Sequence, residues 1–144
     1  MLITAGTVDN YNTMTASWGG MGNLWDKDVC FIFVRPSRYT YEFLEKNDTF
    51  SLSFFSEEWH KALTVCGTKS GRDIDKAKET GLKPIPGDHR TTVFEQARLI
   101  IECKKIYYQD IIPEHFLEPS IEKKYNGWDY HRMYIGEILS VKQK

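Results

Sequence analysis

The chain has 144 residues, with 19 Lys and Arg against 20 Asp and Glu, so its formal net charge is -1 at pH 7. This length suits a single domain over residues 1–144 that buries about two-thirds of the surface of its unfolded chain. Neither sign of charge forms a long run, and no apolar run approaches the ~18 residues of a membrane span. The sequence therefore predicts neither a nucleic-acid partner nor a membrane anchor.

The first residues, Met-Leu-Ile-Thr, lack the basic region and long apolar core of a signal peptide, so we expect a cytoplasmic protein. Residues 2–5 predict a strand, and residues 6–10 predict the turn of a hairpin. Apolar and hydroxyl side chains then alternate from residue 13 to residue 18, which predicts a second strand with one apolar face and one hydroxyl face. A row of hydroxyls on a strand indicates contact with a ligand or water.

Residues 19–23 are rich in glycine and are interpreted as a flexible connection. A dinucleotide-binding loop would need a third glycine where Trp25 stands and a surrounding βαβ unit. Residues 29–34 are apolar on both faces and predict a buried central strand that ends before Pro36, because proline removes a ladder donor. Thr40 is predicted to be the N-cap of a short helix ending at Lys46.

Two helices and a strand are predicted in the middle of the chain. Residues 50–55 alternate as a strand does, with Phe50, Leu52 and Phe54 facing inward. Ser56 is the expected N-cap of a helix that Gly67 ends, and a second helix is expected over residues 73–80, closed by Gly81.

The last third of the chain predicts two long strands, over residues 98–108 and 131–141. In the first of these, the register places Glu102 and Lys104 outward. Between the strands, prolines divide a loop into short helical pieces at residues 113–117 and 119–124, and such a loop often shapes a pocket mouth or a subunit contact. About seven strands with two or three small helices indicate an antiparallel β-barrel with helices at its openings.

No set of side chains has the spacing of a hydrolytic or metal site. The four histidines (His60, His89, His115 and His131) lie far apart in the sequence and are interpreted as surface or structural residues. Cys30, Cys66 and Cys103 show no CxxC spacing and are interpreted as reduced, buried thiols. We therefore assign no catalytic side chain and no metal ligand. Two arginines and two hydroxyls beside the predicted start of the helix at Thr40 do make a plausible anion site.

Three motifs carry a family resemblance: Asn-x-Met-Thr-Ala-Ser-Trp-Gly at residues 12–19, Arg-Pro-Ser-Arg-Tyr-Thr at 35–40 and Cys-Gly-x-x-Ser-Gly-Arg-Asp-x-Asp-Lys at 66–76. In this order and spacing they resemble the flavin reductase-like family of FMN-binding split-barrel proteins, which includes the flavoredoxins. The resemblance implies a mainly β fold, a Greek-key split barrel with a few short helices. It also implies a homodimer with FMN near the subunit interface and NADH or NADPH as a transient co-substrate. Family members commonly have a further segment before the first strand, whereas this sequence begins almost at that strand.

The cofactor-binding positions implied by the motifs are Asn12, Thr13, Met14, Thr15, Ala16, Ser17, Trp18, Arg35, Pro36, Ser37, Arg38, Tyr39, Thr40, Ser70 and Lys76. We expect the phosphate to meet Ser37, Arg38, Thr40, Ser70 and Lys76, the polar edge of the flavin ring to meet the hydroxyl face of the second strand, and the flat faces of the ring to meet Met14, Trp18 and Tyr39. Simpler roles stay open for some of them: Arg35 as the partner of a carboxylate, Lys76 as a solvated lysine, and Trp18 and Tyr39 as core residues.

The resemblance leaves two functions open. In the first, the protein is an NAD(P)H:flavin oxidoreductase, in which hydride reaches N5 of the bound FMN and electrons pass to a small-molecule or protein acceptor, so that no side chain need be catalytic. In the second, it is a flavoredoxin-like electron carrier without reductase activity of its own. A related split barrel that uses haem or F420 is disfavoured, because no axial histidine is apparent and the hydroxyl-and-arginine set suits a terminal phosphate.

Overall fold

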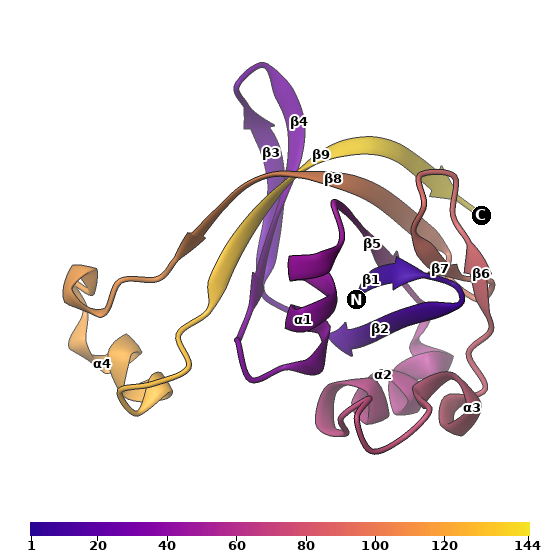
Figure 1. Ribbon diagram of the computed structural model, residues 1–144, viewed down its shortest axis with the longest axis horizontal. Coiled ribbons are helices and arrows are strands. Elements are labelled where there is room, and N and C mark those ends of the chain that lie inside the picture. Colours follow the sequence, from indigo (N-terminus) through magenta and orange to yellow (C-terminus); the bar gives the residue numbers. More distant parts are fainter.

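A computed structural model of residues 1–144 shows a curved seven-stranded antiparallel sheet with the order β2-β1-β5-β8-β9-β4-β3 (Figure 1). Its strands are β1 (Leu2–Thr7), β2 (Asn10–Thr15), β3 (Gly19–Leu24), β4 (Lys27–Val34), β5 (Thr49–Phe54), β8 (Leu99–Asp110) and β9 (Arg132–Gln143). Two short strands, β6 (Pro84–Pro86) and β7 (Thr92–Phe94), form a separate hairpin. The predicted mainly β fold with a few short helices is confirmed.

The helices are short and lie around the edges of the sheet. They are α1 (Tyr39–Lys46), α2 (His60–Thr68), α3 (Lys76–Thr80) and α4 (Pro119–Glu122), with 3₁₀ turns η1 (Glu57–Trp59), η2 (Pro113–His115) and η3 (Lys123–Tyr125). Helix α1 packs on β1 and β2, whereas α2 and α3 lie together below them (Figure 1). No helix is long and apolar enough to cross a membrane.

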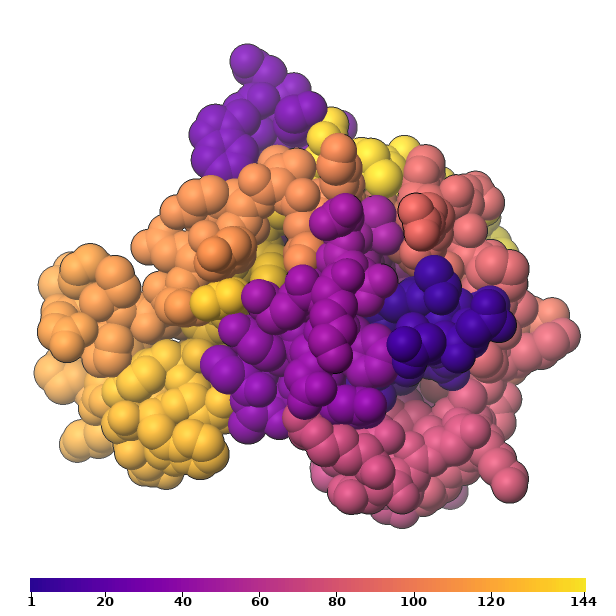
Figure 2. Space-filling view, viewed as in Figure 1, coloured from indigo at the N-terminus to yellow at the C-terminus, as the bar shows by residue number.

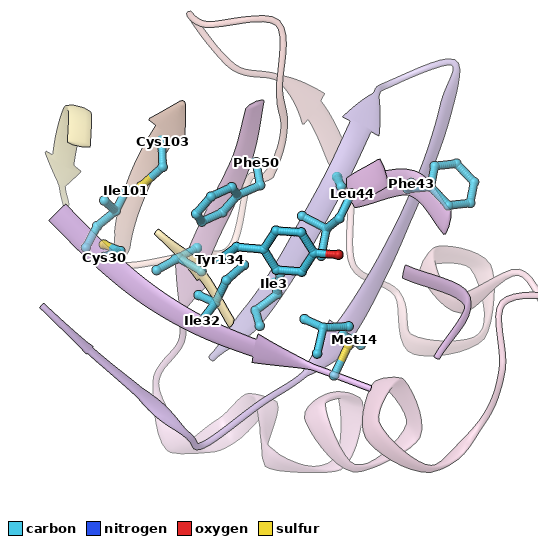
Figure 3. Close-up of a cluster of buried hydrophobic side chains, with 13 residues drawn as sticks. Ile3, Met14, Cys30, Ile32, Phe43, Leu44, Phe50, Ile101, Cys103 and Tyr134 are labelled. Atoms are coloured by element: carbon cyan, nitrogen blue, oxygen red, sulfur yellow. The ribbon is translucent and has the colours of Figure 1, made fainter. Parts of the chain in front are cut away.

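The main core fills the inside of the curved sheet. Thirteen buried side chains from the strands and from α1 form it, including Ile3, Met14, Ile32, Phe50 and Tyr134 (Figure 3). Burying each large apolar side chain stabilises the fold by about 1.5–3 kcal/mol. Two of the thiols lie in this core and the third lies in a smaller cluster under α2; all three are free and buried, as predicted.

Gly136 on β9 allows the side chains of Phe50 and Cys103 to pack closely against the strand. A Cβ atom at this position would lie 2.5 Å from Cζ of Phe50 and 2.8 Å from Cβ of Cys103. Real Cβ contacts are longer than this, so any larger residue would displace the Phe50 ring. The missing side chain therefore makes room for an aromatic ring in the middle of the barrel.

The glycine-rich residues 19–23 were wrongly predicted to be a flexible connection. They belong to strand β3, which pairs with β4 along its whole length. Trp25 and Asp26 form the turn between the two strands with φ values of 55° and 57°, as a two-residue hairpin of type I′ requires. Because β3 is an exposed edge strand, its sequence shows no apolar periodicity that would have revealed it.

Two helix boundaries also differ from the predictions. Helix α1 begins at Tyr39 with Arg38 as its N-cap residue, and Thr40 is buried inside the helix, so Thr40 is not the cap. Gly67 does not end α2, which continues to Thr68. Gly67 faces β2, and this position favours glycine because a Cβ atom there would lie 3.2 Å from Cβ of Thr15. Gly81 does close α3, with φ of 75°.

Glu102 is buried, although the sequence predicted an outward position for it. Its side chain is only 1% exposed because the β6–β7 hairpin covers the second face of β8. Its carboxylate accepts hydrogen bonds from the amides of Asp88 and His89, at 3.1 and 2.9 Å, and from the hydroxyl of Thr91 at 2.5 Å. Alternation in one strand cannot show that its polar face is covered by a distant hairpin.

Two segments project from the body of the molecule. One is the β3–β4 hairpin, and the other is the connection between β8 and β9, residues 111–131, which we call the 111–131 lobe (Figures 1 and 2). The lobe contains the predicted helical pieces as η2, α4 and η3. It returns to the barrel at His131, directly before β9.

Candidate functional site

Two concavities meet at Arg38, at the turn that joins β4 to α1. The first, here called the apolar pocket, has a volume of about 260 Å³ and is lined by Met14, Thr15, Ala16, Ser17, Trp18, Phe33, Arg35, Arg38 and His131. The second, the cationic pocket, has a volume of about 220 Å³ and is lined by Asn12, Ser37, Arg38, Tyr39, Thr40, residues 67–72 and Lys76. The structure thus brings most of the residues of the three motifs into two adjoining pockets with one shared wall.

The cationic pocket has four positively charged side chains and no carboxylate in its lining: Arg38, Lys69, Arg72 and Lys76. Two of these charges have partners outside the pocket, since Lys69 pairs with Glu79 and Arg72 pairs with Glu42. Arg38 and Lys76 form no ion pair. A concavity with two uncompensated cations suits an anion, and a phosphate group most of all.

Arg38 is the only part of the lining that reaches both pockets. The guanidinium is half-buried and donates no hydrogen bond within the chain, whereas that of Arg35 lies 3.8 Å from Asp129 and donates to the carbonyl of Lys124. Burial and the nearby charge of Arg35 lower the pKa of Arg38. A half-buried guanidinium without a partner is costly unless a ligand supplies the acceptors.

Lys76 is only 6% exposed and is not the solvated lysine that the sequence left open. Its ammonium group donates to the carbonyl oxygens of Thr13 and Cys66, at 2.7 and 2.8 Å, so one of its three hydrogens is left for a ligand. Burial lowers its pKa to about 8. The two carbonyls fix the position of the ammonium group at the base of the cationic pocket.

Asn12 holds the floor of the same pocket. Its amide nitrogen donates to Oγ1 of Thr40 at 2.7 Å and so ties β2 to α1. Gly71 approaches so closely that a Cβ atom there would lie 2.0 Å from Oδ1 of Asn12. Only glycine allows the loop after α2 to fold over Asn12, and this packing brings Ser70 to the pocket wall.

The sequence predicted that the hydroxyl face of β2 meets a ligand, and in the structure two of its hydroxyls, those of Thr13 and Thr15, have partners within the chain. The hydroxyl of Thr13 lies 2.8 Å from that of Thr4 and 3.1 Å from the carbonyl of Ile3. The hydroxyl of Thr15 donates to the carbonyl of Leu63 in α2, at 2.5 Å. The hydroxyl of Thr13 is therefore satisfied by β1 and that of Thr15 by α2. The part of this segment that lines the apolar pocket is the run from Met14 to Trp18.

Other predicted residues lie at the edges of the site. Ser37 donates from its amide and its hydroxyl to Asp129, at 2.9 and 2.6 Å, and Pro36 lines neither pocket. The ring of Tyr39 packs edge-on against Phe43 and lies under the guanidinium of Arg72. Tyr39 thus lines the cationic pocket only, and Trp18, which is 48% exposed, is no core residue.

His131 lines the apolar pocket, and the sequence had suggested no such position for it. The residue is buried, its ring lies 4.8 Å from that of Trp18, and its Nδ1 lies 2.8 Å from the hydroxyl of Tyr125. Burial, with the charges of Arg35 and Arg38, lowers its pKa to about 4, so the ring is neutral at physiological pH. The signal available in the sequence was the position of His131 directly before the last strand. This strand pairs with β4, so its first residues lie beside Arg35.

The profile of the flavin reductase-like domain family matches residues 1–144, which is the whole chain. The chain belongs to this family. The resemblance found in the three motifs is thereby confirmed.

Solved structures share the fold of this chain. An FMN-binding protein from Thermus thermophilus, determined with bound 1-cyclohex-2-enone, is similar over 99% of this chain and 68% of that one, with 20% identity and a TM-score of 0.77. The flavoredoxin of Desulfovibrio vulgaris (Miyazaki F) has 25% identity over 99% and 68%, with a TM-score of 0.76. The NADH:FAD oxidoreductase of Streptomyces globisporus C-1027 has 17% identity over 99% and 74%, with a TM-score of 0.75. The predicted split-barrel fold is confirmed.

The two pockets of this flavin reductase-like domain fit a phosphorylated planar ligand. A phosphate needs the uncompensated charge of Arg38 and Lys76, and a planar ring system needs the apolar walls provided by Met14, Trp18 and Phe33. The two pockets share Arg38 in their linings, so a phosphate in one pocket can be attached to a ring system in the other. The residues present are thus those that a flavin mononucleotide would require.

Proposed function

We propose that this protein is an FMN-dependent oxidoreductase that binds the phosphate of FMN in the cationic pocket and its ring system in the apolar pocket. The observation that carries the proposal is the unpaired, half-buried guanidinium of Arg38 in the wall shared by the two pockets. It offers charge to a phosphate on one side while it borders an apolar space on the other. The similarity to the FMN-binding protein from Thermus thermophilus supports the choice of this ligand.

Each part of the lining has a defined task in this proposal. Arg38, the free N–H of Lys76 and the hydroxyl of Ser70 bind the phosphate, and Asn12 keeps the floor of the pocket in place. Met14, Trp18 and Phe33 exclude water from the ring system. FMN held by these residues would supply the redox chemistry between NADH or NADPH and an electron acceptor. The neutral His131 adds no charge to the pocket wall.

The alternative function is that of a flavoredoxin-like electron carrier. The similarity to a flavoredoxin favours the carrier, and the similarity to an NADH:FAD oxidoreductase favours the enzyme. Anaerobic mixing of the FMN-loaded protein with NADH and, separately, NADPH distinguishes them. Rapid bleaching of the bound flavin is expected for the oxidoreductase, and bleaching only with dithionite or a reduced partner protein supports the carrier.

The primary test is FMN binding itself. The purified protein is titrated with FMN, and binding is followed by quenching of flavin fluorescence and by co-elution of the yellow colour from a size-exclusion column. We expect a saturable site with one FMN per chain. Protein that stays colourless and leaves the flavin fluorescence unchanged at a large excess would refute the proposal.

We also propose that the protein is a homodimer. Strand β3 is an exposed edge, and Met21 on β3 and Trp25 in its turn are 58% and 56% exposed. Tyr107 of β8 lies against Trp25, so these side chains form an apolar surface next to an unpaired strand edge. Light scattering on an eluting column tests this: a mass of two chains is expected for the natural protein, and a mass of one chain for Met21→Asp. The cytoplasmic location expected from the sequence stays a prediction.

A further inference from the structure

Two residues in the lining of the apolar pocket, Arg35 and His131, both contact Tyr125 of the 111–131 lobe. Tyr125, near the end of the lobe, is only 4% exposed, and its hydroxyl lies 2.8 Å from Nδ1 of His131. His131 in turn lines the apolar pocket. The lobe projects to one side of the barrel (Figure 1), and the hydrogen bond between Tyr125 and His131 joins it to the pocket lining.

Tyr125 is fixed in position from several sides. The guanidinium of Arg35 lies over its ring, 4.8 Å from the centroid, and Arg35 also donates to the carbonyl of Lys124. The ring of Tyr130 stacks on Tyr125 at 4.9 Å, with an angle of 28° between the planes. A side chain held by stacking on one face and by a cation on another has little freedom to turn its hydroxyl away from His131.

The direction of the hydrogen bond follows from counting protons. Neutral imidazole carries one N–H, and the phenol of Tyr125 carries one O–H. If Nδ1 of His131 carried the proton and donated it to the phenol, the buried hydroxyl of Tyr125 would have no acceptor of its own in the chain. If Tyr125 donates to Nδ1, both groups are satisfied, and the imidazole proton must then be on Nε2.

Nε2 of His131 has no partner within the chain, yet it is not sealed in the interior. Ser53 Oγ is the one fully buried side-chain oxygen or nitrogen without a hydrogen-bond partner, so Nε2 is not fully buried. The residue borders the apolar pocket, and that is where a ring nitrogen that is not fully buried can find an acceptor. Arg35 and Arg38 on the same wall disfavour a second proton on this ring, whereas Asp129 favours one.

We propose that Tyr125 is a positioning residue that holds His131 in the Nε2–H tautomer, so that His131 donates a hydrogen bond to a carbonyl oxygen or ring nitrogen of the planar ligand in the apolar pocket. The tautomer itself depends only on the chain. The identity of the acceptor rests on the proposed function, in which the planar ligand is the flavin. The pocket is thereby specific for ligands with an acceptor at that edge.

The tautomer is tested without any cofactor. Long-range ¹H–¹⁵N correlation spectra of the labelled protein at neutral pH distinguish protonated from unprotonated ring nitrogens, and His131→Gln identifies which signals belong to His131. We expect Nε2 to be protonated and Nδ1 unprotonated. In Tyr125→Phe we expect a mixture of the two tautomers. Finding Nδ1 protonated in the natural protein would overturn the proposal, and so would an unchanged spectrum in Tyr125→Phe.

A matched variant controls for damage to the lobe. Tyr130→Phe removes a hydroxyl from the same aromatic stack; this hydroxyl donates to Glu122 at 2.6 Å and forms no hydrogen bond with His131. It is expected to keep the tautomer of the natural protein. If Tyr130→Phe changes the tautomer as much as Tyr125→Phe does, the effect comes from general loosening of the lobe and the assignment to Tyr125 fails.

Ligand binding gives the second measurement. His131→Gln places an amide N–H near the position of Nε2, and His131→Phe removes the donor. We expect FMN affinity to fall about three- to tenfold in His131→Phe and to be largely retained in His131→Gln. Equal affinity in both variants and in the natural protein would place the acceptor elsewhere and overturn the role of His131. A protein that binds no FMN at all would refute the proposed function while the tautomer spectra still decide the role of Tyr125.

Discussion

Arg35 and Arg38 lie three residues apart, but only Arg35 has a carboxylate partner, Asp129 at 3.8 Å. Arg35 also packs on Tyr125 and donates to Lys124, so its charge is committed to the 111–131 lobe. Arg38 is left with an unpaired charge in the wall between the two pockets. The two arginines of this motif thus have different roles: Arg35 is structural, and Arg38 is available to a ligand.

Replacing Arg38 by alanine should weaken FMN binding ten- to hundredfold. This corresponds to about 1.5–3 kcal/mol, the contribution of a charge-assisted hydrogen bond to a phosphate. Arg98→Ala is the matched control, since Arg98 is exposed and distant from both pockets. Fluorescence titration of both variants measures the effect. An affinity in Arg38→Ala equal to that of the control would remove Arg38 from the binding site.

Because of Lys76, the affinity for FMN and the stability of the free folded protein should depend on pH in opposite directions. Burial lowers its pKa to about 8, so above that pH the free folded protein loses a charge that the unfolded chain keeps up to about 10.5. Between these values the unfolded chain binds more protons, so stability rises with pH while affinity for the phosphate falls. Titration and urea unfolding at pH 7, 8 and 9 measure both. Lys76→Met should flatten both trends, and identical pH profiles in this variant would exclude Lys76 as the cause.

His131 should make the protein less stable in acid. Its pKa is lowered from 6.5 to about 4, so within that range the unfolded chain takes up a proton that the folded chain does not. Stability therefore falls as the pH drops from 6.5 to 4, by up to about 3 kcal/mol. His131→Gln should remove this part of the slope. His60→Gln, at an exposed histidine, is the control and should keep the slope of the natural protein.

Gly136→Ala should destabilise the fold by about 1–3 kcal/mol, because the new methyl group overlaps the ring of Phe50. The pair should be coupled: Phe50→Leu makes room for the methyl group. The double variant is expected to lose less stability than the sum of the two single losses in urea unfolding. Simple additivity would show that the methyl group is accommodated by some other movement.

Glu102→Gln should lower stability by about 1–3 kcal/mol, because the amide group of glutamine has only one oxygen to face four donors, the hydroxyl of Ser140 being the fourth. Hydrogen exchange should increase at the amides of Asp88 and His89. Glu95→Gln breaks an exposed pair with Lys83 and is expected to change stability by less than about 0.5 kcal/mol. Unchanged protection at residues 88–91 in Glu102→Gln would contradict the anchoring role.

The sequence predicted the fold where local patterns and tertiary structure agree. Strand β4 and the alternating strand β5 were predicted because their own residues form the core. Strand β3 was missed because its side chains contact little, and the burial of Glu102 was missed because the β6–β7 hairpin that covers it lies elsewhere in the sequence. Local periodicity carries no information on what a distant segment covers.

The site was predicted in the same uneven way. The motifs indicated the turn around Arg38 and the loop at Ser70, and the structure brings both to the cationic pocket. The hydroxyls of Thr13 and Thr15 were predicted to contact a ligand, because the sequence does not show that the Thr15 hydroxyl donates a hydrogen bond to a carbonyl of α2. His131 was missed because its place in the pocket depends on the strand pairing of β4 with β9.

Trp18 stands half-exposed at the mouth of the apolar pocket, with its indole ring 4.8 Å from the imidazole of His131. Indole emission is quenched both by a neighbouring protonated imidazole and by a flavin that absorbs in its emission range. The natural protein therefore carries its own optical reporter: the emission of one tryptophan, identified with Trp18→Phe, should dim when the pocket fills and when acid charges the ring beside it.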